Sequence, residues 1–333
     1  MNTGSAIAQA DICAVICTHN RTALLRRALD SLLAQSLRPA EILVVDNAPR
    51  DASTQSLIVE SFPSVRYVCE RKPGLNFARN RALRETKREI VAYIDDDAIA
   101  DTDWIARTSE VFAENGRIAI CTGCVKAYSL ETEAQRLFEA QGGFDRGAER
   151  IHMPRDARHR RMHGLNAPLI AWSIAIGVGA SLAVRRGALG MIGNFDNALD
   201  FGAVCPGGGD VDVIWRALEA GFEVVYEPRA IVFHEHRREL EQVYAQILGH
   251  RRAEIAFLTK SLWSAQRGGQ FVIFAFLSWR LLKPGFRLLR LAFRDDPLPA
   301  PMLWRLWGTQ WRGLLSYGQA SRLAAERSAG TGA

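Results

Sequence analysis

The chain lacks the features of a membrane-spanning or a secreted protein. No run reaches the roughly 20 apolar residues that a spanning helix needs, and the uncharged run at residues 270–279 is too short. No secretory signal precedes the six cysteines, so we expect reduced thiols and a cytoplasmic protein. Cys121 and Cys124 have metal-ligand spacing, but the sequence has no second such pair, so packing is their expected role.

The first two thirds of the chain also lack an excess of positively charged residues. Residues 1–236 carry 27 Lys and Arg against 30 Asp and Glu, whereas residues 237–333 carry 15 against 6. We therefore expect the basic C-terminal region to meet an anionic surface. No zinc, helix-turn-helix or RNA-binding signature accompanies this charge, which argues against nucleic acid as the partner.

What the sequence does contain is a regular alternation of strand and helix patterns. Apolar strand runs at 11–17, 41–45 and 65–69 alternate with helical patterns at 22–35 and 51–60. This rhythm predicts an α/β protein with a parallel sheet built from right-handed crossovers. Further strands are expected at 90–94, 118–128, 177–184, 221–226 and 230–234, and further helices at 75–86, 102–115, 185–192, 210–220 and 239–262.

Three consecutive carboxylates follow the expected strand at 90–94. Asp95, Asp96 and Asp97 stand at a carboxyl end, where open α/β sheets bind ligands. Since side chains alternate along extended backbone, Asp95 and Asp97 can face one side while Asp96 turns away. Their mutual repulsion calls for a cation, and carboxylate oxygens favour Mg²⁺ or Mn²⁺. The alternative is an acidic, solvated turn.

Polar residues also end the other strands and begin the helix at 75–86. Asp46 follows one strand and residues 70–72 follow another, so they would lie on the same sheet edge as the aspartates. Arg79 lies near the helix start, where unpaired amides and positive charge favour a phosphate. The alternative is a solvated basic face.

A glycine-rich segment, residues 207–209, precedes Asp210 and Asp212 at a helix start. The helix dipole keeps a carboxylate ionised there, which suits a general base, although a capping role for one of the two is an alternative. His234 ends the last expected strand. It would extend the same sheet edge, as a metal ligand or as a structural residue.

The C-terminal region combines cations with aromatic residues. Arg280, Lys283, Arg287, Arg290 and Arg294 fall at spacings of three and four, and Trp304, Trp307 and Trp311 follow. Such a pattern is typical of a helix lying in a membrane interface. The alternative is an arm that packs against the catalytic domain or a second subunit. Residues 129–170 show no clear period, and we expect a lid or a substrate-specific insertion there.

The order of these motifs resembles the family 2 glycosyltransferases, which have the nucleotide-diphospho-sugar transferase (GT-A) fold. The matching segments are 15–21, 44–47, 72–80, 94–97, 179–181, 209–212, 221–228 and 234–236, together with Arg216. The resemblance implies a Rossmann-like, mixed, mostly parallel central sheet flanked by helices, with a helical C-terminal appendage. The expected division is a disordered 1–10, a catalytic domain 11–237 with nucleotide-binding half 11–128 and acceptor half 129–237, a membrane-associating region 238–320 and a disordered tail 321–333.

The resemblance also implies a role for individual residues. The donor would be bound by Thr18, Asn20, Arg21, Asp46, Asp51, Arg71, Lys72, Arg79, Asn80 and Asp96. Asp95, Asp97 and His234 would hold Mn²⁺ or Mg²⁺. Asp210 would be the base, with Asp212 as the alternative, and the acceptor would contact Gly179, Ser181 and Trp215.

The expected activity is an inverting transfer of one sugar from a nucleotide-diphospho-sugar to a glycan acceptor. The Gln-x-x-Arg-Trp motif of processive synthases is absent after Asp212, so we expect single additions. The basic C-terminal region suggests a polyprenyl-diphosphate-linked acceptor in bacterial-type polysaccharide synthesis, at the cytoplasmic face of the membrane. Two alternatives remain open: a soluble transferase for a protein or small molecule with a dimer arm, and a non-catalytic nucleotide-sugar-binding or scaffold protein.

Overall fold

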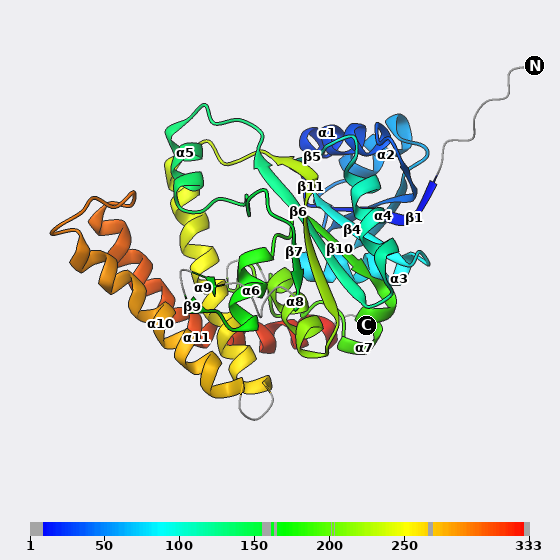
Figure 1. The fold of residues 1–333 in the computed structure, drawn as a ribbon. Coiled ribbons are helices and arrows are strands. Elements are labelled where there is room, and N and C mark those ends of the chain that lie inside the picture. The colour runs from blue at the N-terminus through cyan, green and yellow to red at the C-terminus, as the bar shows by residue number, and fades with distance from the viewer. Residues whose placement is uncertain are drawn as a thin grey trace, which may run out of the picture.

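The computed structural model describes residues 9–154, 161–162, 165–200, 202, 204–265 and 269–329, and it is built around one large mixed sheet (Figure 1). In spatial order its strands are β3 (Arg66–Glu70), β2 (Arg38–Asn47), β1 (Gln9–Thr18), β4 (Ile90–Asp95), β10 (Ser181–Arg185), β6 (Ile118–Ala127), β11 (Glu223–His234) and β5 (Ala98–Ala100), with β7 (Ile151–Met153) also paired to β11. The predicted α/β class with a mixed central sheet is therefore confirmed.

Parallel pairing is concentrated in two blocks of this sheet. Strands β3, β2, β1 and β4 pair in parallel, and so do β6 and β11, whereas β10 is antiparallel to both of its neighbours. The register aligns Thr18 with Asp46 and Cys17 with Asp95. The polar ends of β1, β2 and β4 therefore meet at one edge, as the sequence predicted.

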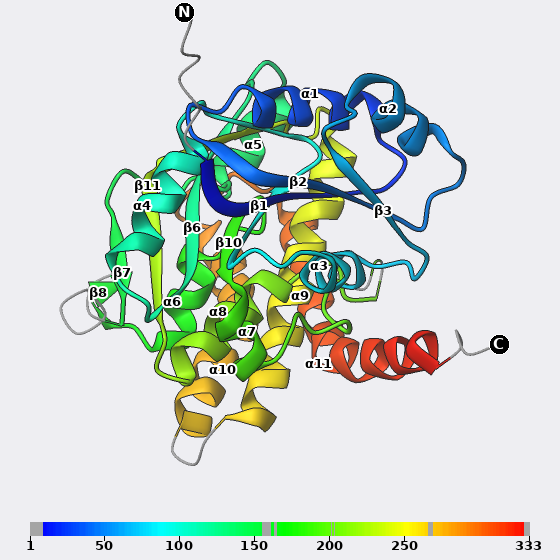
Figure 2. The ribbon, with the colours of Figure 1, turned by 90° about the vertical axis from the view of Figure 1, so that its right-hand side faces the viewer.

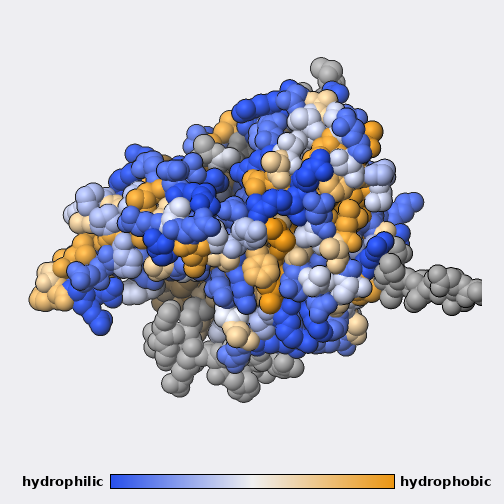
Figure 3. All heavy atoms as spheres, turned by 90° about the horizontal axis from the view of Figure 1, so that it is seen from above, coloured by the Kyte–Doolittle hydropathy of each residue, from blue (hydrophilic) through white to orange (hydrophobic). Residues whose placement is uncertain are grey.

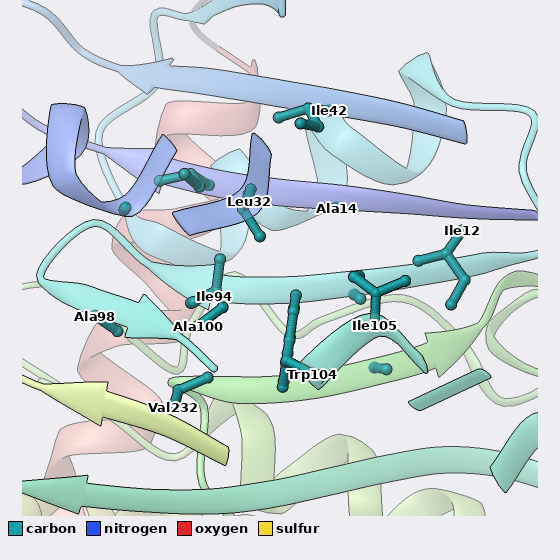
Figure 4. Packing of buried hydrophobic residues seen from close by; sticks show 14 of the residues in the cluster. Ile12, Ala14, Leu32, Ile42, Ile94, Ala98, Ala100, Trp104, Ile105 and Val232 are labelled. Atoms are coloured by element: carbon teal, nitrogen blue, oxygen red, sulfur yellow. The ribbon is translucent and has the colours of Figure 1, made fainter. Parts of the chain in front are cut away.

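Helices cover both faces of the sheet, which parallel strands require because they are apolar on both sides (Figure 2). One face is covered by α1 (Thr22–Leu33), α2 (Ser53–Ser61) and α4 (Trp104–Glu114). The other is covered by α3 (Leu75–Glu85), α6 (Leu169–Ile176), α7 (Arg186–Ile192) and α8 (Gly209–Glu219). Figure 4 shows Trp104 among the side chains of the first face, and its indole donates to Ser181 Oγ at 2.9 Å.

Three helices form the C-terminal region: α9 (Leu240–Ser264), α10 (Gly269–Arg290) and α11 (Ala300–Ala329). Side chains of α9 and α10 pack with Ile170 and Trp215 of α6 and α8. Helix α11 lies along α9 and reaches the loop after β3, where Lys72 Nζ donates to Ser328 O at 3.2 Å. None of the helices in the described part of the chain is long and apolar enough to cross a membrane.

Several predicted boundaries differ from the structure. Strands expected at 221–226 and 230–234 form the single strand β11, with an irregularity between Glu227 and Ile231. The strand expected at 177–184 begins only at Ser181, because residues 177–180 form the turn that connects α6 to β10. The tail 321–333, expected to be disordered, is helical through Ala329, because Ala324 belongs to an apolar cluster with Phe77 and Arg327 donates to Pro73 O. The disordered start expected at 1–10 lies outside the described residues except for Gln9 and Ala10, which belong to β1.

The segment 129–170, which showed no period, contains three kinds of element. Helix α5 (Glu133–Ala140) begins with a capping box in which Thr132 and Gln135 bond to each other's backbone. Strand β7 joins the large sheet, and β8 (Arg161–Met162) pairs with β9 (Leu165–Asn166) in a separate hairpin. Elements this short carry too few residues for a period to be recognised.

We predict that two glycine-to-alanine changes in α11 have opposite effects on stability. A Cβ at Gly313 would lie 2.7 Å from Ile255 Cβ and 2.8 Å from Arg252 O, so Gly313→Ala should lower the free energy of unfolding by ~1–3 kcal/mol. A Cβ at Gly318 meets nothing within 4 Å, so Gly318→Ala should raise it by up to ~1 kcal/mol. Urea unfolding measures both. Stabilisation by both changes would show that α11 does not dock on α9.

Candidate active site

The structure brings together the three residues predicted to bind a metal. One ligand atom each from Asp95, Asp97 and His234 can be chosen so that all lie within 4.8 Å of one another. Strand β5 returns the chain beside β11, where Ala98 pairs with His234, so His234 Nε2 comes within 3.2 Å of Asp97 Oδ1. Two carboxylates and an imidazole are a donor set that suits Mn²⁺, and Mg²⁺ less closely.

The electrostatics of this cluster also favour a cation. Burial, together with the charge of Asp97, raises the pKa of Asp95 to about 6. Burial opposes ionisation of Asp97 as well, but the hydrogen bond and charge of His234 hold the pKa of Asp97 below its usual value. A divalent ion bound between these groups would balance the negative charge of the two carboxylates.

Asp96 is not part of the cluster, although it is not strand alternation that separates it, because Asp96 and Asp97 form a turn after β4. It is buried, and its two oxygens accept from Thr18 Oγ1 at 2.7 Å and from Arg21 Nη1 at 3.1 Å. Arg21 also lies 3.2 Å from Asp97 Oδ2. Arg21 therefore ties two neighbouring carboxylates to the loop after β1.

A cavity of about 820 Å³ opens above this edge of the sheet. Among its lining residues are Thr18, Arg21, Asn47, Asp95, Asp96, Asp97 and His234. Of the donor residues that the sequence predicted, Thr18, Arg21 and Asp96 therefore lie on its wall. Asn20 is not among the lining residues, and its side-chain oxygen accepts from the backbone of Arg50 at 3.0 Å.

Asp46 lies behind this wall with one unpaired oxygen. Its Oδ2 accepts from the hydroxyl of Tyr67 at 3.0 Å, whereas Oδ1 has no partner among the described residues. Burial raises the pKa of Asp46. Asp46 is fully buried and lines neither cavity at this edge, although its neighbour Asn47 lines the larger one.

Other predicted donor residues have structural contacts instead. Asp51 is exposed and accepts from the backbone N–H of Ser53 at the start of α2. Asn80 is buried and donates to Phe195 O at 2.8 Å, so it fixes the loop before Asp200. Arg71 is exposed and lines neither cavity at this edge, and Lys72 is bonded to the end of α11.

A second cavity, of about 460 Å³, adjoins the first and shares Asp95 with it. Buried Arg79 lies on its wall, 3.5 Å from Asp200 Oδ2. Gly179 also lines it, and a Cβ there would lie 2.8 Å from Arg79 Nη2 and 3.4 Å from Asp210 Oδ2. The absence of a side chain at Gly179 therefore leaves room for Arg79 and Asp210.

The structure separates the two candidate bases. Asp210 lies in the first turn of α8 and lines the second cavity. Asp212 is only 1% exposed, and its oxygens accept from Arg216 Nε at 2.9 Å and from Lys260 Nζ at 2.6 Å. Asp212 is thus neutralised by two cations, and Asp210 is the carboxylate available to a ligand.

Two of the predicted acceptor residues are packed rather than open. Trp215 lies in an apolar cluster with Phe257 of α9 and does not line the second cavity. Ser181 is buried and accepts from Trp104. The sequence analysis did not single out Phe144, Arg146, Asp200 or His250, which all line the second cavity. They come from loops and from α9, where no spacing or motif marked them.

Solved structures with this arrangement of elements define the fold. The chain aligns with a mannosyltransferase of Pyrobaculum calidifontis, solved with GDP-Man and Mn²⁺, at TM-score 0.58 and 18% identity, covering 96% of this chain and 90% of that one. It also aligns with GalNAc-T7, solved with UDP, GalNAc and Mn²⁺, at TM-score 0.51 and 14% identity, covering 84% of this chain and 57% of that one. The fold is therefore the GT-A fold.

Sequence comparison names the family. Residues 13–192, more than half of the chain, match Glycosyl transferase family 2, and the chain belongs to this family. The pre-mycofactocin glycosyltransferase of Mycobacterium tuberculosis is 27% identical over 294 residues, which are 85% of this chain and 54% of that protein. The chain thus spans about half the length of this curated relative.

We predict that Asp95→Asn makes the thermal stability of the protein independent of Mn²⁺. A carboxyl whose pKa is raised to about 6 contributes stability only while protonated, and that contribution is lost as the pH rises through about 6. At a pH of about 7.5 in EDTA, Asp95→Asn should therefore melt at or above the wild-type temperature, and this advantage should shrink below a pH of about 5. Mn²⁺ should raise the Tm of the wild type and leave the variant within ~1 °C of its EDTA value. A wild-type Mn²⁺ response in the variant would contradict the assignment.

Proposed function

We propose that this protein is an inverting, non-processive glycosyltransferase that moves one sugar from a nucleotide-diphospho-sugar to a glycan acceptor. The main support for this proposal is that two cavities meet at Asp95. One holds the cluster of Asp95, Asp97 and His234, and the other holds Asp210. The GT-A structures that the chain resembles were solved with GDP-Man or UDP and with Mn²⁺, which supports a nucleotide-sugar donor and Mn²⁺ here.

The donor would lie in the larger cavity. Asp46, which stands next to the lining residue Asn47 at the end of β2, would accept from the base or ribose of the nucleotide. The diphosphate would lie beside Asp95 and Asp97, where bound Mn²⁺ or Mg²⁺ would stabilise negative charge on the leaving group. Arg21, exposed at 41% of its side chain, is held beside the cluster by Asp96 and adds positive charge on the same side.

The acceptor would lie in the second cavity, next to Asp210. A carboxylate there can take the proton from an acceptor hydroxyl while the oxygen attacks the sugar carbon opposite the leaving diphosphate. The new bond then forms as the old one breaks, and the configuration inverts. Arg79 lies between Asp210 and Asp95, and its charge opposes protonation of Asp95.

We also propose that the C-terminal helices place the acceptor site at an anionic membrane surface, where a polyprenyl-diphosphate-linked acceptor would be presented at the cytoplasmic face. The predicted cationic stripe is not fully exposed, since Arg280 pairs with Glu254 and Arg287 with Asp296. The exposed stripe of α10 and its end is apolar: Phe271, Phe274, Trp279, Leu282, Phe286, Leu289 and Phe293. Exposed Arg290 and Arg294 border it.

This surface matches a protein that lies in a membrane interface. Large exposed apolar side chains on one helix face need a partner, and neighbouring arginines favour anionic lipid. Trp304 and Trp311 of α11 add exposed aromatic area. Figure 3 shows hydrophobic and hydrophilic residues side by side at the left end of the molecule, where the α10–α11 connection lies in Figure 1.

We predict that Asp210→Asn removes turnover and that Asp212→Asn removes stability. Loss of a general base should lower the transfer rate by about 10²–10⁴-fold, which is the usual contribution of such a group. The Tm should not change. Asp212→Asn removes one carboxylate partner from Arg216 and from Lys260, which keeps Asp196, and should cost ~1–3 kcal/mol of unfolding free energy. Transfer rates and urea unfolding of both variants decide the matter. A stable but inactive Asp212→Asn beside an active Asp210→Asn would make Asp212 the base.

We predict that the apolar stripe of α10 governs vesicle binding. Leu289 and Phe293 are 71% and 88% exposed, so the double change Leu289→Ser and Phe293→Ser should weaken flotation with phosphatidylglycerol vesicles by ~10-fold or more. Val59 on α2 is 67% exposed, and Val59→Ser is the matched control. Equal flotation of the double variant and the wild type would contradict the membrane surface. Loss of dimerisation instead of flotation would favour a subunit arm.

A further inference from the structure

The second ring nitrogen of His234 belongs to a buried chain of polar groups. While Nε2 faces Asp97, His234 Nδ1 lies 3.1 Å from His236 Nδ1. His236 Nε2 lies 2.7 Å from Glu139 Oε1. The two rings are 7% and 3% exposed, respectively. Four side chains therefore form one line that begins at the metal cluster and ends on α5.

The chemistry of the groups in this line fixes where the protons lie. A carboxylate can only accept, so His236 Nε2 must carry the hydrogen that bonds to Glu139. A neutral imidazole has a single N–H, and His236 Nδ1 is consequently an acceptor. The short Nδ1–Nδ1 contact then requires that His234 Nδ1 carries a hydrogen. With a hydrogen fixed at Nδ1, His234 Nε2 can release the hydrogen that it donates to Asp97 and offer its lone pair to a cation.

We infer that Glu139 and His236 are positioning residues, which hold His234 in the form protonated at Nδ1 so that Nε2 can bind a divalent cation. The inference rests on the proposed function, because it concerns the metal of that site. Partners of this kind orient a metal-binding histidine and fix its tautomer. The inference also gives α5, in the segment without a recognisable period, a role in the site.

Apolar groups around the line limit the other partners of these rings. Phe138 meets the ring of His236 edge-on at a centroid distance of 4.9 Å, and Phe144 meets the ring of His234 at 5.1 Å. A Cβ at Gly143 would lie 2.4 Å from Glu139 Oε1, so the glycine leaves the space that this carboxylate occupies. The arrangement thus directs Glu139 to His236 and His236 to His234.

The test measures Mn²⁺ binding by the full chain, with the free ion followed by electron paramagnetic resonance. His236→Phe keeps an aromatic ring but cannot accept, and should bind Mn²⁺ about 10–100-fold more weakly. His236→Asn places an amide oxygen near the position of Nδ1 and should restore most of the affinity. Glu139→Gln, whose amide can also donate, should weaken binding by ~10-fold, whereas Glu133→Gln on the exposed side of α5 should not.

A second readout observes the proton itself. In metal-free protein labelled with ¹⁵N-histidine, His234 Nδ1 should carry a hydrogen, with its signal assigned by its loss in His234→Gln. An unprotonated Nδ1, or wild-type Mn²⁺ affinity in His236→Phe, would overturn the inference while leaving the proposed function intact. Equal weakening by His236→Phe and His236→Asn, with a lower Tm in EDTA, would show that His236 only packs. A wild type that binds no Mn²⁺ would overturn both the inference and the metal of the proposed function.

Discussion

The site depends on how the protein accommodates three consecutive carboxylates at the end of one strand. Adjacent negative charges repel each other strongly in a partly buried setting. Groups from different elements offset this repulsion. Thr18 and Arg21 donate hydrogen bonds to Asp96, and His234 lies beside Asp97. Asp95 keeps a raised pKa, so the balance of charge is still incomplete. That residual imbalance supports the proposal of a divalent cation at this strand end.

The C-terminal helices take part in the site rather than only following it. Helix α9 supplies His250 to both cavities and Lys260 to Asp212. Helix α11 contributes Tyr317, whose hydroxyl donates to Asp196 in the loop before Asp200. A basic and aromatic region that the sequence assigned to a membrane surface therefore also holds the walls of the second cavity. One set of helices therefore connects the exposed surface of the C-terminal region to the cavity that Asp210 lines.

Local sequence patterns predicted much of the architecture because they record local forces. Apolar runs separated by amphipathic helices identify the buried parallel strands, and their polar ends identify one sheet edge. Asp95, Asp96 and Asp97 are neighbours in the chain, so the sequence alone predicts an acidic group at the end of this strand. The sequence pattern did not predict the elements of the segment around α5, because these short elements are stabilised by contacts with the rest of the fold.

The sequence by itself determined the α/β class, the polar ends of the strands and the acidic cluster, since each depends on residues close together in the chain. Only the tertiary structure decided which carboxylate is free. Asp210 and Asp212 are two residues apart at one helix start, yet Asp212 is neutralised by Lys260, which lies 48 residues further along the chain. The same holds for Glu139 and His236, because the burial and partners of a side chain are set by segments that meet only in the folded protein.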